Sequence, residues 1–319
     1  MRRTRKITVL AAAGVLAIGV AACGSDDNNS GGGSGDLSGK IALDGSSTVL
    51  PFAQAAAELF NQDNPNVKIT VGSSGTGGGF EKFCAGETDI SDASRSIKPE
   101  EAAACKKKGV TYQEVQVAND GIAIVTNKDL KIDCMTVAQL KKLWDKGSTV
   151  KTYNQIDPSF PNVPVKLFGP GTDSGTFDFF TDKINGEEDR SRSDYSPSED
   201  DNVTLTGVEG SKGGLGYFGF SYYEGAKDKI NLVGVGEKAG ECVKPSTQAI
   251  QDGSYKPLSR PLFMYPSEKS LAEKQVSGFM DFVLKDQAEI AKESQIVPMT
   301  SEQLTNANGE LKKGESAAG

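Results

Sequence analysis

Serine, threonine and glycine gather at three points of the chain, each directly after a short apolar run and directly before a helix-like pattern. The three segments are residues 41–48, 71–79 and 168–176. The start of a helix has unpaired backbone N–H groups and the positive end of the helix dipole, so it binds oxyanions. One such segment alone is more often an ordinary helix cap. Three copies converging on one point would form an anion site with few formal charges.

Composition excludes catalysis that depends on histidine and leaves carboxylates, lysine and serine as the side chains that could act. The 319 residues include no histidine, which rules out a Ser-His-Asp triad, a Cys-His dyad and a His-ligated zinc site. Ser174 could act as a nucleophile only with a lysine base, and no Ser-x-x-Lys spacing occurs there. The formal net charge of −8 argues against nucleic acid as a partner. We expect no enzyme activity, no metal and no cofactor.

Two other motifs are weaker. Residues 214–219 fit the GxGxxG pattern, but no predicted strand leads into them and aromatic residues crowd them, so we interpret them as a packed turn. The acidic residues 199–201 are interpreted as a solvated surface turn rather than a calcium site.

The N-terminus has the features of an export signal. Residues 1–22 begin with four basic residues and continue as an apolar stretch too short for a comfortable membrane span. Small residues precede Cys23 as in a bacterial lipobox, and a polar Ser/Asp/Asn/Gly run follows it. We expect lipidation at Cys23, a flexible tether over residues 23–38, and anchoring to the outer face of the cell membrane. A plain signal peptide that contains a cysteine is the alternative.

The remaining cysteines fit an oxidising compartment. Cys84, Cys105, Cys134 and Cys242 are even in number and allow three pairings, among which spacing alone does not choose. We favour Cys84–Cys105 with Cys134–Cys242, because the first pair closes a short loop between neighbouring elements.

The rest of the chain alternates short apolar runs with helical patterns, which predicts an α/β fold, and 37% hydrophobic residues are enough for a core. A turn is expected at residues 119–121, between two strands, and a surface excursion at 185–202. Strands are expected at residues 40–43, 67–71, 89–90, 115–118, 122–125, 165–168 and 262–265, and helices at 51–61, 79–85, 136–144, 177–184 and 272–284.

From Lys40 to about Leu304 the chain resembles the PstS family, the phosphate-binding lipoproteins of bacterial ABC transporters, and is most similar to its SphX-like branch. The motifs that carry the resemblance are residues 44–51, 75–98, 169–180 and 191–195. The resemblance implies a type II periplasmic-binding-protein fold, in which two α/β lobes are joined by two hinge strands near residues 118–121 and 258–262.

In the implied domain organisation, residues 39–119 with 262–319 form lobe 1 and residues 120–261 form lobe 2. The implied function is capture of inorganic phosphate in a cleft that closes by a hinge motion, followed by delivery to the permease of an ABC transporter. We expect a monomer.

The resemblance also implies a set of ligand residues. Two positions depart from the family pattern: Ser94 stands where many relatives have an aspartate acceptor, and Pro170 where many have an arginine. Arg95 either supplies that charge or forms a surface ion pair. As acceptor of the phosphate proton, Asp120 and Asp92 rank ahead of Asp173. The expected phosphate-binding residues are Ser47, Thr48, Ser73, Ser74, Ser94, Arg95, Asp120, Ser174, Gly175 and Thr176.

Three other functions stay open on the sequence. The protein could bind a different oxyanion, such as sulfate or molybdate. It could be a phosphatase-like hydrolase that uses Ser174, or a surface lipoprotein with a purely structural role.

Overall fold

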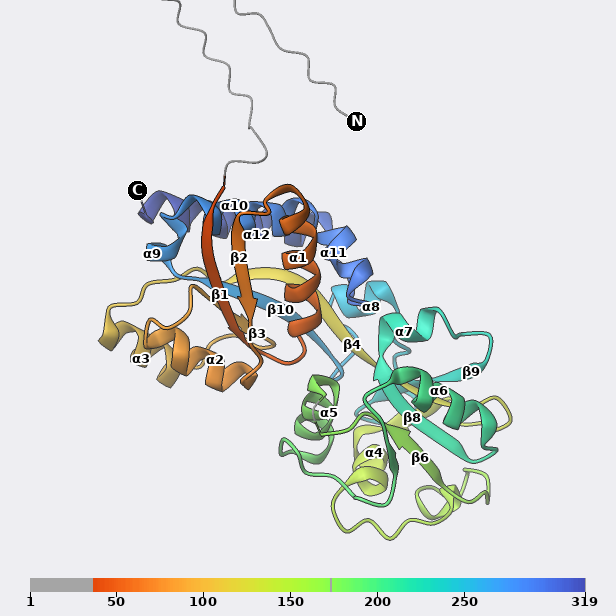
Figure 1. The fold of residues 1–319 in the computed structure, drawn as a ribbon. Helices are drawn as coiled ribbons and strands as arrows, with labels where there is room; N and C mark the ends of the chain where they lie inside the picture. The colour runs from red at the N-terminus through yellow and green to blue at the C-terminus, as the bar shows by residue number, and fades with distance from the viewer. Residues whose placement is uncertain (1–36, 173, 319) are drawn as a thin grey trace, which may run out of the picture. The chain divides into compact units, whose positions relative to one another are not determined.

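The computed structural model describes residues 37–172 and 174–318 (Figure 1). The predicted signal peptide, Cys23 and most of the predicted tether lie outside the described residues, as does Asp173. The described part is an α/β structure built on one mixed ten-stranded sheet. No helix among the described residues is both long and apolar enough to cross a lipid bilayer.

The secondary structure alternates strands and helices along most of the chain. The strands are β1 (Gly39–Gly45), β2 (Val67–Val71), β3 (Ile90–Ala93), β4 (Val115–Asn127), β5 (Cys134–Thr136), β6 (Lys166–Gly169), β7 (Ser196–Pro197), β8 (Gly214–Gly219), β9 (Ile230–Gly236) and β10 (Ser259–Pro266). The helices are α1 (Leu50–Asp63), α2 (Gly75–Cys84), α3 (Pro99–Lys108), α4 (Val137–Trp144), α5 (Gly175–Phe180), α6 (Asp201–Gly210), α7 (Phe220–Glu224), α8 (Thr247–Gln251), α9 (Glu268–Leu271), α10 (Lys274–Lys285), α11 (Gln287–Glu293) and α12 (Ser301–Ala318). A 3-10 turn, η1, covers Tyr153–Gln155, and a π-helical turn, η2 (Thr181–Asn185), continues α5.

Two long antiparallel strands, β4 and β10, connect the two lobes. The strand order is β2-β1-β3-β10-β4-β8-β6-β7, with β9 also paired to β4 and β5. Residues 115–121 of β4 pair with β10, and residues 122–127 pair with β8 and β9. The predicted turn at 119–121 is therefore wrong, because these residues continue one strand of 13 residues. Asn119 is held there by backbone hydrogen bonds in both directions with Val297.

Residues 214–219 also differ from the expectation. They form β8, which is buried between β4 and β6, and not a packed turn. Glycine at position 216 lets the backbone of β8 lie close to that of β6, since a Cβ there would lie 2.8 Å from the carbonyl oxygen of Phe168.

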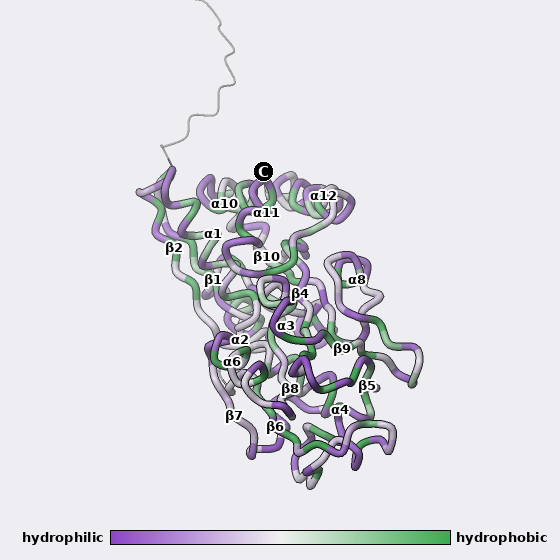
Figure 2. Tube along the Cα trace, turned by 90° about the vertical axis from the view of Figure 1, so that its right-hand side faces the viewer, coloured by the Kyte–Doolittle hydropathy of each residue, from purple (hydrophilic) through white to green (hydrophobic). Residues whose placement is uncertain are grey.

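Each lobe has its own hydrophobic core. One core draws on residues 41–118 and 262–311, and packs α1, α10 and α12 against one face of the sheet. Along α10 and α12 hydrophobic and hydrophilic residues alternate (Figure 2), as expected for helices with one buried face. A smaller cluster under α2 and α3 covers the opposite face. The other core lies within residues 122–258, joined by Val297.

The structure has two disulfides, in the pairing that we favoured. Cys84 of α2 is bonded to Cys105 of α3, and Cys134 of β5 is bonded to Cys242, which follows β9. Their sequence separations are 21 and 108 residues. Cross-links of this kind stabilise a fold mainly by restricting the unfolded chain, by about 3–5 kcal/mol on the chain-entropy account.

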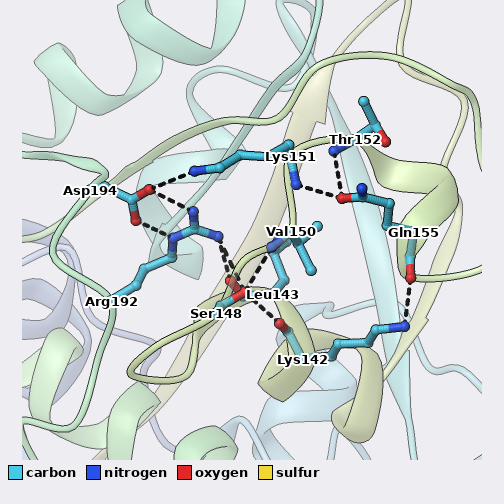
Figure 3. Close-up of polar contacts among 9 residues, drawn as sticks. All are labelled: Lys142, Leu143, Ser148, Val150, Lys151, Thr152, Gln155, Arg192 and Asp194. Carbon is cyan, nitrogen blue, oxygen red and sulfur yellow. Dashed lines mark hydrogen bonds and ion pairs between the residues drawn. The ribbon is translucent and has the colours of Figure 1, made fainter.

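The polar segment 185–202 is anchored by a buried arginine. Arg192 is only 6% exposed, although a surface excursion is predicted here. Its guanidinium donates to both carboxylate oxygens of Asp194, to the carbonyl of Leu143 and to the hydroxyl of Ser148 (Figure 3). Lys151 reaches the same carboxylate at 3.4 Å. The segment is thereby fixed to the C-terminal end of α4, which packs against η2.

Candidate functional site

A polar cavity of about 710 Å³ lies where the three predicted segments meet. Both lobes and the hinge strand β10 contribute to its wall. The lining residues are Ser46, Ser47, Thr48, Ser74, Gly75, Thr76, Gly77, Ser94, Arg95, Ser96, Lys98, Glu101, Gly175, Asp178, Phe179, Asp182, Lys183, Glu188, Ser259, Arg260 and Pro261.

The first segment forms a tight turn between β1 and α1. Ser46 is buried, its N–H donates to the carbonyl of Asp92 at 2.9 Å, and its hydroxyl accepts from the N–H of Thr48 at 3.2 Å. These bonds fix the turn, so the hydroxyls of Ser47 and Thr48 face the cavity.

The second segment enters α2 earlier than predicted. The helix begins at Gly75 rather than at residue 79, because the glycine run itself forms the first helical turn. Ser74 precedes the helix and hydrogen-bonds to the carboxylate of Asp44 through both its N–H and its hydroxyl. The backbone of Gly75, Thr76 and Gly77 therefore lines the cavity at a helix N-terminus, where free N–H groups are expected.

The third segment meets the first one directly. Ser174 caps α5 by accepting a hydrogen bond from the N–H of Thr176 at 3.2 Å. A Cβ built on Gly175 would lie 2.3 Å from the hydroxyl oxygen of Thr48 and 2.6 Å from that of Ser47. Only glycine permits two turns from different lobes to approach this closely.

An arginine from the hinge strand lies at this meeting point. Arg260 of β10 donates from Nη2 to the hydroxyl of Thr48 at 2.6 Å and to the carbonyl of Gly175 at 3.2 Å. Its Nε donates to Asp120 at 3.2 Å, and its guanidinium lies 3.7 Å from the centre of the Phe179 ring. The cation thus contacts both lobes and both hinge strands at once.

A second arginine lines the opposite end of the cavity. Arg95 forms a two-fold ion pair with Glu101, with N–O distances of 2.7 and 2.8 Å. The hydrogen bond to Glu101 raises the pKa of Arg95, and the negative charge of Glu188 across the cavity adds to the effect. Arg95 is thus ion-paired and also lines the cavity, and its contact with an anion stays a prediction.

The carboxylate that lines the cavity at the first turn is Asp178 of α5. It accepts a hydrogen bond from the hydroxyl of Ser47 at 3.3 Å. Burial, followed by the charges of Glu188 and Asp189, raises the pKa of Asp178 to about 6. Asp92, by contrast, is fully buried outside the cavity lining, and burial, with the nearby Asp44, raises its pKa well above the usual range.

Six of the ten expected ligand residues line the cavity: Ser47, Thr48, Ser74, Ser94, Arg95 and Gly175. Four do not: Ser73 is exposed, Asp120 is engaged with Arg260, and Ser174 and Thr176 form the cap of α5. Sequence reasoning missed Arg260, Asp178, Ser46 and Thr76. Thr76 and Ser46 lie inside two of the predicted segments, and a full count of their hydroxyls would have included them. No local signal marks Arg260, whose partners are 140, 212 and 85 residues away.

Among the described residues no three His, Cys, Asp or Glu side chains are grouped as metal ligands. The geometry is that of an anion site made from hydroxyls, helix N-termini and two arginines, each of which already has a carboxylate partner.

Comparison with known proteins agrees with this geometry. Residues 30–287 match the family described as the PBP superfamily domain. The chain is 42% identical to protein SphX of Synechococcus elongatus, over 86% of this chain and 82% of that protein. It is 39% identical to the phosphate-binding protein PstS of Staphylococcus saprophyticus, over 93% and 92% of the two chains.

Among solved structures, a possible phosphate-binding protein from Planctomyces limnophilus has 43% sequence identity and a TM-score of 0.82. The similarity covers 88% of this chain and 99% of that one. The chain therefore belongs to the PBP superfamily and, within it, to the group of the SphX and PstS proteins.

Proposed function

We propose that this protein binds inorganic phosphate outside the cytoplasm and delivers it to an ABC transporter. The observation that carries the proposal is the convergence of three hydroxyl-rich turns and two arginines on one cavity between two hinged lobes. Relatives that match nearly the whole chain are named phosphate-binding proteins. It is a binding protein and not an enzyme.

Affinity follows from the number of donors. A hydrogen bond to a charged group contributes about 1.5–3 kcal/mol, and micromolar binding requires about 8 kcal/mol. The hydroxyls of Ser47 and Thr48, the backbone at Gly75, Thr76 and Gly77 and the guanidinium of Arg260 provide enough such bonds even after the cost of closing the lobes.

Selection of phosphate over sulfate requires an acceptor, because phosphate keeps a proton near neutral pH and sulfate does not. Asp178 suits this role better than Asp92 and Asp120, since it lines the cavity beside Ser47 and they do not. A carboxylate facing an unprotonated sulfate oxygen would leave two negative groups without a proton between them, which strongly disfavours binding.

The proposal also covers the membrane anchor, the oligomeric state and the bounds of the two lobes. Cys23 carries the lipid anchor, residues 23–38 form the tether, and the protein acts as a monomer. The lobes comprise residues 39–119 with 262–319 and residues 120–261. Two separate cores, one joined by residues 115–118 of β4 and the other by residues 122–125, support this division.

The test is calorimetry on the full-length protein in detergent, after unfolding and refolding to remove any anion carried through purification. We expect one phosphate site per chain and at least a thousandfold weaker binding of sulfate, in line with about 10⁴-fold rejection by mispaired polar groups. If sulfate or molybdate binds more tightly than phosphate, that anion is the ligand of the protein. Absence of heat with all three anions would overturn the proposal.

A further inference from the structure

Arg260 and Asp120 form the most buried ion pair of the described residues that touches the cavity. Their side chains are only 12% and 11% exposed, and the N–O distance is 3.2 Å. The two residues face each other across the antiparallel strands β10 and β4, so the pair lies where the two hinge strands run side by side.

Among the described residues, the side chain of Asp120 forms no ion pair or hydrogen bond other than the one with Arg260. It does not line the cavity, whereas Arg260 does. Arg260 is therefore the contact that joins Asp120 to the cavity.

A buried guanidinium requires a counter-charge, since leaving it unpaired in a site of low polarity is costly. Burial lowers the pKa of Arg260, and the charge of Asp120 acts in the opposite direction. Asp120 thus supplies the counter-charge of Arg260 when the cavity holds no anion. The same negative charge opposes a second anion at the guanidinium.

We propose that Asp120 is an internal counter-ion that competes with phosphate for Arg260 and so limits the affinity of the site. This inference rests on the proposed function. Removing the carboxylate charge makes phosphate the main counter-ion of Arg260, so the ligand-free protein loses stability and phosphate binds more tightly. The two effects are linked, because a ligand that restores a missing interaction recovers the stability that was lost.

The test compares Asp120→Asn with Asp145→Asn in the full-length protein. Asp145 is a matched control: it pairs with Arg190 at 2.6 Å, lies outside the cavity lining, and loses the same unit of charge.

We expect Asp120→Asn to bind phosphate about tenfold or more tightly than the unchanged protein, from the Coulomb energy of one partly screened charge. Sulfate should gain by a similar factor, so the ratio of the two affinities stays the same. The ligand-free melting temperature should fall, and saturating phosphate should restore it. The control should keep its phosphate affinity.

Each other result decides against the proposal. Weaker phosphate binding with lost discrimination against sulfate would make Asp120 the proton acceptor. Unchanged affinity would leave the pair a purely structural contact. A second neutral variant, Asp120→Ser, repeats the test with a smaller side chain. If neither variant folds even with saturating phosphate, phosphate does not replace the counter-charge and the proposal fails. If the unchanged protein binds no phosphate, the proposed function fails first.

Discussion

Asp178 lies in the cavity wall and holds its proton more tightly than an exposed aspartate does. It lines the proposed phosphate site beside Ser47, and its pKa is raised to about 6 because burial and the nearby Glu188 and Asp189 disfavour its charge. A carboxylate held in this way has a strong tendency to accept a proton, which hydrogen phosphate can supply and sulfate cannot.

We predict that Asp178→Asn loses most of the discrimination between phosphate and sulfate. An amide NH₂ donates to either anion, so sulfate affinity should rise while phosphate affinity falls, each by about tenfold or more. Titration of both anions at pH 7.5 measures the change. Unaltered selectivity would exclude Asp178 as the acceptor.

The same substitution should change the pH dependence of stability. The folded protein holds the Asp178 proton more tightly than the unfolded chain, so this stabilisation is complete below about pH 4 and is lost as the pH rises through about 6. Asp178→Asn should therefore raise the ligand-free melting temperature at pH 7.5 by about 2–4 °C and leave it nearly unchanged at pH 4.

Asp194→Asn serves as the control with the opposite sign. Its hydrogen bond to Arg192 lowers the pKa of Asp194, so its contribution is present at neutral pH and disappears on acidification. The variant should lose stability at pH 7.5 and match the unchanged protein at low pH. If the melting temperatures of the two variants differ from that of the unchanged protein in the same direction across this pH range, the pKa directions given for Asp178 and Asp194 are both contradicted.

At the scale of elements, the start of α5 must approach the start of α1 for the site to form. Gly175 makes this possible, since a Cβ there would lie 2.5 Å from the backbone nitrogen of Thr48. We predict that Gly175→Ala keeps the lobes apart and weakens phosphate binding by at least about tenfold, because one turn loses contact with the anion. Titration calorimetry measures the loss.

Gly309→Ala is the matched control, because Gly309 lies inside α12 with open space around its missing Cβ. It should leave phosphate affinity unchanged and add about 0.5–1 kcal/mol to the free energy of unfolding through helix propensity. Equal phosphate affinity for Gly175→Ala and the unchanged protein would show that the contact of the two turns is not needed for binding.

The elements that the sequence predicts well are those with local signals. The turns before α1 and α5 follow from serine, threonine and glycine next to an apolar period, and the structure brings both to one cavity. Elements that depend on pairing with distant residues cannot be predicted from such local signals. Residues 119–121 have the composition of a turn, yet pairing with β10 and contact with residue 297 keep them extended. Arg260 escapes for the same reason, because its role depends on strands that meet only in the folded chain.

At the scale of the whole molecule, the binding unit and its expected attachment are separate. Every proposed ligand residue lies beyond residue 45, and the lipidation site precedes them all. We predict that Cys23→Ser moves the protein from the membrane fraction to the soluble fraction and leaves its phosphate affinity unchanged. Ser25→Ala, in the same segment, should fractionate like the unchanged protein. Retention of the serine variant on membranes would rule out a lipid anchor at Cys23.

The path of the chain through the sheet sets the order in which the two cores can be completed. β10 lies between β3 and β4, at the centre of the sheet, although it is the last strand to be synthesised. The core within residues 122–258 is nearly complete before β10 emerges from the export channel, whereas residues 41–118 wait for the strand and helices that follow. Strands β1 and β2 are thus exported first but complete their core among the last, and until then their apolar residues lack the partners that would bury them.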